Sequence, residues 1–167
     1  MSSGSSWTPL AVLTLLARLA VGGWFIYLGT LKLMAPPADF LKIINEFEVL
    51  PTQPPILINS VAVFLPVLEV IAGACLVLGV FLRGSALAIL VSMLGFMPAL
   101  IFRAMGIQEA EGLSFCQVAF DCGCGTGEVN ICKKLTENSA LIFGAALALF
   151  SKWHVLTLTK LPGADAE

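Results

Sequence analysis

The chain has 167 residues, of which 58% are hydrophobic and 12% charged, and its mean hydropathy is +0.95. Soluble domains are about half apolar and about a quarter charged, so this composition argues against a water-soluble domain and indicates a lipid bilayer as partner. The net charge of −2 is too small to indicate nucleic acid. No polar stretch is long enough to build its own core, so residues 1–167 are predicted to form one membrane domain.

The first predicted membrane span covers residues 9–34, because a bilayer core needs about 20 apolar residues in a helix. The residues before it lack the basic start of a signal peptide, so the segment is expected to remain in the membrane. Arg18 lies inside this span, where a charge is costly unless it is paired or faces a polar cavity. Trp24, Tyr27 and Lys32 are interpreted as interfacial anchors.

An amphipathic segment follows the first span. Its apolar positions recur at helical spacing and are Phe40, Ile43, Ile44, Phe47 and Leu50. Charged and amide side chains fill the other face, so the segment is predicted to be a helix that lies on the membrane surface. Pro36 and Pro37 precede it and favour a helix start.

Three further spans are predicted over residues 55–82, 84–107 and 135–158, so the expected fold is an all-α, polytopic four-helix bundle. The turn between the second and third spans is short, which indicates an antiparallel helical hairpin. Glu69 lies near the middle of the second span. Arg18 and Glu69 are therefore expected to form an intramembrane ion pair that locks two helices, the alternative being a polar pocket for a proton or a quinone.

The strongest signal in the chain is a cysteine-rich loop between the third and fourth spans. It contains Cys116, Cys122, Cys124 and Cys132. Gly123 separates the two middle cysteines and lets the backbone adopt the positive φ that a close thiol pair needs. A disulfide within so short a segment is strained and easily reduced.

Three interpretations of this loop stay open. In a thiol–disulfide relay, Cys122 and Cys124 exchange, and Cys116 and Cys132 are either a second pair or resolving partners. In a structural interpretation, one or two disulfides staple the loop. In a metal site, four thiolates would hold zinc or an iron–sulfur cluster, but a single residue between Cys122 and Cys124 makes shared tetrahedral ligation awkward.

The side of the membrane on which the loop lies follows from two opposing arguments. The count of basic residues near the spans slightly favours a cytoplasmic position for the long loops. Thiols that work as a disulfide belong outside the reducing cytoplasm. We give the cysteines more weight and expect the loop on the periplasmic face of a bacterial inner membrane.

Several motifs resemble the DoxX-type four-helix membrane proteins. They are Arg18–Gly23 with Gly29 and Lys32, Leu50-Pro51, and Leu65–Glu69 with Gly73. Within that family, Asp121-Cys122-Gly123-Cys124-Gly125 is similar to the loop of the MauE branch, the methylamine utilisation membrane proteins. The likeness covers about Trp7 to His154. The chain departs from the MauE pattern at Gly125–Gly127 and Glu137, and Cys116 and Cys132 look additional.

The resemblance implies a role in redox maturation. MauE-type proteins are thought to work beside a thioredoxin-like periplasmic partner in forming the disulfides of a quinoprotein dehydrogenase subunit, and DoxX relatives are linked to quinone-coupled sulfur oxidation. We therefore expect a membrane thiol–disulfide redox protein that uses Cys122 and Cys124, holds no metal, and passes electrons to or from a quinone. The alternative is a non-catalytic subunit of a larger membrane redox complex with stapling disulfides. A transporter is disfavoured by the few intramembrane polar groups and the lack of an inverted repeat.

Overall fold

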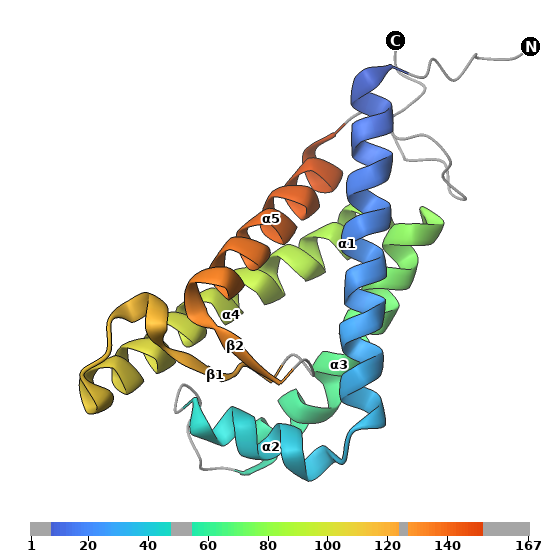
Figure 1. The fold of residues 1–167 in the computed structure, drawn as a ribbon. Coiled ribbons are helices and arrows are strands. Elements are labelled where there is room, and N and C mark those ends of the chain that lie inside the picture. The colour runs from blue at the N-terminus through green and yellow to red at the C-terminus, as the bar shows by residue number, and fades with distance from the viewer. Residues whose placement is uncertain (1–7, 48–54, 124–126, 152–167) are drawn as a thin grey trace, which may run out of the picture.

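The computed structural model describes residues 8–47, 55–123 and 127–151, and most of these are helical. The helices are α1 (Pro9–Met34), α2 (Pro37–Glu46), α3 (Pro55–Leu78), α4 (Leu82–Glu111) and α5 (Ile131–Phe150). Between α4 and α5 lie the short 3₁₀ helix η1 (Phe115–Gln117) and the strands β1 (Ala119–Asp121) and β2 (Glu128–Asn130). Figure 1 shows α2 lying across the lower end of α1, on the same side of the molecule as the β1–β2 hairpin.

Three of the described helices, α1, α3 and α4, are long and apolar enough to cross a membrane. The predicted fourth span corresponds to α5, which begins at Ile131 instead of 135 and is described as far as Ser151. The rest of the predicted range to 158 lies outside the described residues. The early part of α5 carries Lys133, Lys134 and Glu137, and this helix is not among the three candidate spans.

The boundary between α3 and α4 differs from the sequence prediction. The second span was expected to end at 82, but α3 ends at Leu78 because Gly79 adopts a positive φ of 73°. The N–H of Val80 donates to the carbonyl of Cys75 at 2.9 Å, the arrangement of a Schellman cap. The third span consequently starts at Leu82 instead of 84. It also continues beyond 107 to Glu111.

Glycines bring α1 and α3 into close antiparallel contact. A Cβ on Gly22 would lie 2.8 Å from the carbonyl oxygen of Gly73, and one on Gly73 would lie 2.7 Å from that of Gly22. A Cβ on Gly29 would approach the carbonyl oxygen of Pro66 at 2.9 Å. Small residues allow membrane helices to approach to this distance, and their packing replaces the hydrophobic effect that lipid does not supply.

Two apolar clusters form the interior. The bundle core lies among α1, α3, α4 and α5 and consists of Val21, Phe25, Ala72, Leu76, Leu82, Ala86, Ile89, Met93, Ala145 and Ala148. The hairpin core lies where the β hairpin meets the helices and consists of Leu28, Leu100, Ala104, Val118, Phe120, Cys122 and Ile131. The hairpin is therefore anchored on the helices by buried apolar side chains and is not a free loop.

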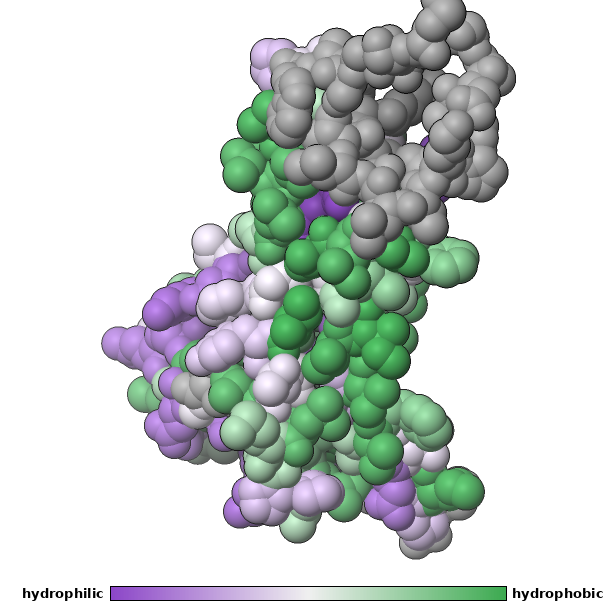
Figure 2. All heavy atoms as spheres, turned by 90° about the vertical axis from the view of Figure 1, so that its right-hand side faces the viewer, coloured by the Kyte–Doolittle hydropathy of each residue, from purple (hydrophilic) through white to green (hydrophobic). Residues whose placement is uncertain are grey.

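The outer surface is strongly apolar. Figure 2 shows hydrophobic residues over most of the face that α1 and α3 present, while the hydrophilic surface lies mainly in the lower half of that view. The exposed large hydrophobic side chains of α1 and α3 include Leu16, Phe64 and Ile71. A soluble monomer rarely exposes so large an apolar surface, whereas lipid solvates it without cost. The surface thus agrees with a multi-pass membrane protein.

Candidate functional site

The cysteine-rich segment folds as a short hairpin that a disulfide joins to α5. Strands β1 and β2 pair antiparallel, with Ala119 opposite Asn130 and Asp121 opposite Glu128. Cys116, in η1, is bonded to Cys132, in the first turn of α5, with their Cα atoms 5.2 Å apart. The side-chain amide of Asn130 also donates to the carbonyl of Cys116. Both ends of the hairpin are therefore held at the start of α5.

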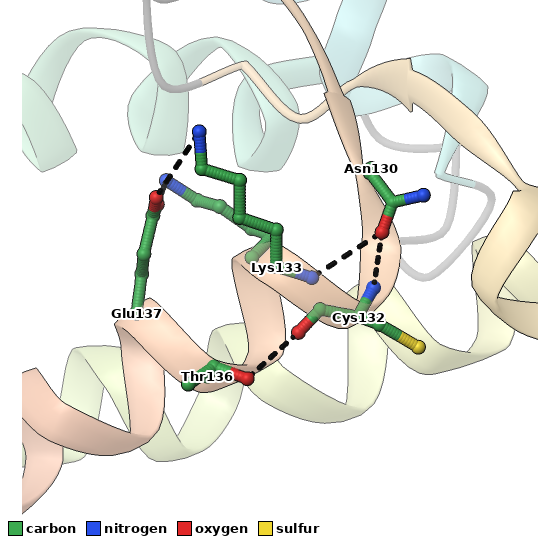
Figure 3. Close-up of polar contacts among 6 residues, drawn as sticks. Asn130, Cys132, Lys133, Thr136 and Glu137 are labelled. Atoms are coloured by element: carbon green, nitrogen blue, oxygen red, sulfur yellow. Dashed lines mark hydrogen bonds and ion pairs between the residues drawn. The ribbon is translucent and has the colours of Figure 1, made fainter.

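Cys132 sits in a well-defined helix N-terminus. The Asn130 side-chain oxygen accepts from the backbone N–H groups of Cys132 at 3.1 Å and Lys133 at 3.3 Å (Figure 3). The hydroxyl of Thr136 donates to the carbonyl of Cys132 at 2.9 Å. A helix N-terminus carries partial positive charge, and Cys132 lies in this first turn of α5.

The cysteines differ sharply in accessibility. Cys116 is exposed and Cys132 is half-buried, so the disulfide between them can be reached from solvent. Cys122 is only 1% exposed and belongs to the hairpin core. Cys124, the predicted partner of Cys122, lies outside the described residues. Cys116 and Cys132 are bonded to each other, an arrangement that fits both a second exchanging pair and a structural staple.

A tight turn presses the middle of the hairpin against α2. The Asp121 side chain accepts from the backbone N–H of Gly123 at 2.9 Å, and Gly123 has a φ of +71°. A Cβ at Gly123 would lie 2.9 Å from Cγ2 of Ile43 and 3.3 Å from Cε2 of Phe40. Gly123 is thus required both by its backbone conformation and by the closeness of α2, and the predicted positive φ at this position is confirmed.

An apolar cavity of about 250 Å³ adjoins Cys122. Its walls come from α2, α3, α4 and the hairpin. The lining residues are Phe40, Ile43, Ile44, Phe47, Val61, Leu65, Ser92, Gly95, Phe96, Ala99 and Cys122. Ser92 is the one hydroxyl in this wall, and it donates to the carbonyl of Ala88 at 2.8 Å. Cys122 therefore faces an apolar space, while Cys116, at one end of the disulfide, is exposed.

A buried ion pair lies close to α2. Nζ of Lys32, in α1, is 2.6 Å and 2.8 Å from the two carboxylate oxygens of Glu69, in α3, and both side chains are 8% exposed. The same Nζ lies 5.5 Å from the ring centroid of Phe40, which lines the cavity. Lys32 was interpreted as an interfacial anchor, and this buried role was missed. The signal that could have found it was Glu69, a buried acid that needs a cation in reach.

The expected ion pair between Arg18 and Glu69 is wrong. Within the described residues, the guanidinium of Arg18 donates to the carbonyls of Leu76 at 3.2 Å and Val77 at 3.5 Å. Glu69 instead lies opposite Gly29, since a Cβ there would be 3.1 Å from the Glu69 Cβ. Gly29 is 11 residues beyond Arg18 (29 − 18), or roughly 16 Å along a helix, which exceeds an arginine's reach.

Arg18 has a structural role at the end of α3. The last carbonyls of a helix have no partner within it and carry partial negative charge. Leu76 and Val77 are such residues, because α3 ends at Leu78. Arg18 is fully buried and supplies donors to both. Its position inside an apolar span is therefore explained by the backbone of the neighbouring helix.

A third buried cation lies at the start of α5. Lys134 has a side-chain exposure of 2%, and its Nζ is 3.7 Å from a carboxylate oxygen of Glu137. Lys133, by contrast, is exposed and reaches the same carboxylate at 4.0 Å (Figure 3). The sequence analysis did not separate these two lysines, because adjacent residues on a helix differ only in which face is buried.

The disulfide also bears on the metal interpretation. A four-cysteine zinc or iron–sulfur site needs all four sulfurs as thiolate ligands. Two of the four, those of Cys116 and Cys132, are bonded to each other. The arrangement in the structure therefore does not fit a four-thiolate site.

These features define a multi-pass membrane protein with a disulfide-closed cysteine hairpin packed against a short helix at one end of its spans. The chain belongs to the family described as methylamine utilisation protein MauE, whose profile matches residues 10–151. The matched range includes all of α1 after its first residue, α2 to α5 and the whole cysteine hairpin. The resemblance to MauE proteins that the sequence indicated is thus confirmed. No curated protein and no solved structure gives a significant match.

Proposed function

We propose that this protein is a membrane thiol–disulfide redox protein that forms disulfides in an extracytoplasmic partner. The observation that carries the proposal is the placement of two kinds of cysteine in one hairpin, an accessible Cys116–Cys132 disulfide and the buried Cys122. An accessible disulfide can meet a protein thiol, and a buried cysteine is shielded from it. This difference in accessibility between the cysteines suits sequential thiol–disulfide exchange better than a single structural disulfide.

The first exchange takes place at Cys116, the more exposed end of the disulfide. A thiolate of the partner attacks the Cys116 sulfur, the Cys116–Cys132 bond breaks, and Cys132 leaves as a thiolate. A second thiolate of the partner then attacks the partner's sulfur in the mixed disulfide and releases Cys116. The partner gains a disulfide, this chain gains a dithiol, and two electrons and two protons have moved from one to the other. The α5 N-terminus favours the leaving thiolate of Cys132.

The second exchange involves Cys122 and Cys124, the pair that the sequence analysis assigned to redox chemistry. When these two residues are joined as a disulfide, the new dithiol reduces them by the same reaction and regenerates the Cys116–Cys132 bond. Cys122 would then hold the electrons on the apolar side of the hairpin. In this scheme Cys116 and Cys132 contact the partner, and Cys122 and Cys124 follow them in the chain.

The scheme also implies a compartment for the hairpin, a membrane topology and a class of partner. A disulfide persists in an oxidising compartment, so the hairpin lies on the periplasmic face of the inner membrane. In this topology α5 is the fourth span of the bundle, and α2 lies at the membrane surface with its charged side outward. The partner is a soluble thiol protein of the thioredoxin-like class, because such proteins present a reactive thiol pair at their surface.

A redox titration with thiol mapping tests the proposal. The purified protein is equilibrated in thiol–disulfide buffers, and each cysteine is identified by alkylation and mass spectrometry. We expect Cys116 and Cys132 to cycle between about −270 and −120 mV, the range of exchange proteins. A Cys132→Ser variant leaves Cys116 as a lone thiol, which should form a mixed disulfide with the partner, by the reverse exchange, when the partner is supplied in its disulfide form. A Cys75→Ser variant, in the last turn of α3, should behave as wild type.

A structural subunit is the second candidate, and one observation favours it. The disulfide joins residues 16 apart and connects η1 to α5. Such a cross-link lowers the conformational entropy of the unfolded chain, which is how a structural disulfide stabilises a fold. A staple would have a midpoint potential below about −300 mV and would therefore stay oxidised in mild reductant. That result, together with no trapped partner, would replace the exchange proposal with this one.

A further inference from the structure

The cavity beside Cys122 has the character of a site for a lipid-soluble ligand. Its lining residues are apolar apart from Ser92 and Cys122, and none of them is charged. Gly95, on the α4 wall, is exposed, so the cavity opens on the outside of an apolar helix. In a bilayer this opening meets lipid and not water. A charged or strongly polar ligand would have to give up its hydration without gaining a partner there.

The walls also suit a flat ring. Phe40, Phe47 and Phe96 all line the cavity, and the rings of Phe47 and Phe96 have centroids 6.0 Å apart. Aromatic side chains hold planar rings by stacked or edge contacts. The volume of about 250 Å³ lies below the roughly 300–1,000 Å³ of sites for drug-sized ligands, so a single ring group fits while a long tail stays in the lipid.

Cys122 is the residue of this wall that can exchange electrons with a bound ligand. Cys122 lines the cavity and is 1% exposed to solvent. We propose that the cavity between α2, α3 and α4 binds the ring of a membrane quinone, which takes electrons from the hairpin at Cys122. The inference rests on the proposed thiol–disulfide function, because it names the acceptor for that chemistry.

The redox balance of this step is simple. Oxidation of the two thiols of Cys122 and Cys124 to a disulfide releases two electrons and two protons. A quinone consumes the same number when it becomes a quinol. The hairpin is then ready to accept electrons from the Cys116–Cys132 dithiol again. Lys32 and Glu69 act at a distance by holding Phe40, one wall of the cavity, in place.

Two glycines of α4 allow a matched test. A Cβ on Gly95 would meet no atom within 4 Å, so a leucine there enters the cavity without a clash at its first atom. Gly106 lies on the same helix, is equally open, and does not line the cavity. Gly95→Leu and Gly106→Leu therefore share the change in helix propensity, and they differ in whether the cavity is filled.

The experiment measures binding of a short-chain azido-benzoquinone to the full chain in quinone-free nanodiscs. We expect photolabelling of wild type to map to the α2 segment or to Cys122, and the Kd to rise at least about tenfold in Gly95→Leu while Gly106→Leu is unchanged. Label spread evenly over the lipid-facing helices, or equal affinity in both variants, would show that acyl chains fill the cavity and would overturn the inference. The wild-type labelling decides the matter even when Gly95→Leu does not fold.

A second measurement on the same wild-type sample separates this inference from the proposed function. Reduction of the Cys116–Cys132 disulfide by a soluble dithiol is followed without quinone. Quinone binding at the cavity with a disulfide that does not exchange would refute the relay and with it the electron-acceptor role. Exchange without quinone binding would refute the quinone site and leave the relay in place.

Discussion

The two ends of the α1–α3 interface each bury a cation, but they satisfy it in different ways. Arg18 donates to main-chain carbonyls at the end of α3, within the helical bundle. Lys32 pairs with the Glu69 side chain and also contacts Phe40 of α2, which packs against Gly123 of the hairpin. The first cation caps a helix, whereas the second connects the spans to the cysteine site. A charge inside a membrane span is therefore not by itself a functional signal. Its contacts show whether it stabilises a helix or connects to a candidate site.

Loss of the Glu69 carboxylate should have the largest effect on stability. Glu69→Gln leaves the ammonium of Lys32 buried without its counter-charge, and breaking one side of a buried pair costs about 3–5 kcal/mol. Chemical unfolding in mild detergent measures this change in the free energy of unfolding. The double variant Lys32→Met, Glu69→Leu should recover most of the loss, because no charge then remains buried. A single-variant loss below about 1 kcal/mol would contradict the role assigned to the pair.

Gly123→Ala should have the next largest effect, and it should act on the hairpin. A non-glycine residue at positive φ costs about 1–2 kcal/mol, and overpacking against Ile43 and Phe40 adds about 1–3 kcal/mol. Gly127→Ala is the control, since Gly127 has a φ of 74° but its Cβ would meet nothing within 4 Å. Hydrogen exchange of the hairpin amides measures the difference. Equal effects of the two variants would show that contact with α2 is unimportant.

Arg18→Leu should destabilise the bundle and leave the hairpin unchanged. The substitution removes the charge-assisted bonds to the carbonyls of Leu76 and Val77 but also removes a buried charge, so a net loss of about 1–3 kcal/mol is expected. The midpoint potential of Cys116 and Cys132 should match wild type, because Arg18 lies roughly 16 Å along α1 from the level of Glu69. A shifted potential would show that the two ends of the interface are coupled.

The smallest effect is expected at the surface of α2. Glu46 lies 3.9 Å from Nζ of Lys42 and 3.7 Å from a guanidinium nitrogen of Arg103, and its side chain is 45% exposed. Exposed pairs of this kind contribute about 0–1 kcal/mol and are screened by salt. Glu46→Gln should therefore change unfolding by less than about 1 kcal/mol, with the difference vanishing in high salt. A loss comparable to that of Glu69→Gln would mean that α2 is held mainly from its charged side.

Helices with a clear hydrophobic pattern were predictable from the sequence. Spans α1 and α3 and the start of α4 follow from runs of apolar residues, and α2 follows from the spacing of Phe40, Ile43 and Phe47. The cysteine-rich segment was identified as the candidate site because four thiols in polar sequence exceed what packing needs. The short strands β1 and β2 were not predicted, since three residues each are too few for a pattern of alternation.

Pairings between distant residues were the part that failed. The partner of Glu69 was expected to be Arg18 because both lie near the middle of a span. The true register depends on which glycines meet, and Gly22 opposite Gly73 sets it. A shift of a few residues along an antiparallel helix pair exchanges one partner for another. The composition of either helix does not reveal the register between them.

The sequence by itself determined that the chain is a membrane protein, that its helices are long and apolar, and that four of its cysteines are concentrated in one segment. These properties are local, because they depend on the hydrophobicity and spacing of neighbouring residues. Only the tertiary structure decided that Cys116 bonds to Cys132, that Cys122 faces an apolar cavity, and that Lys32 neutralises Glu69. Those facts depend on contacts between elements far apart in the chain, which packing alone selects.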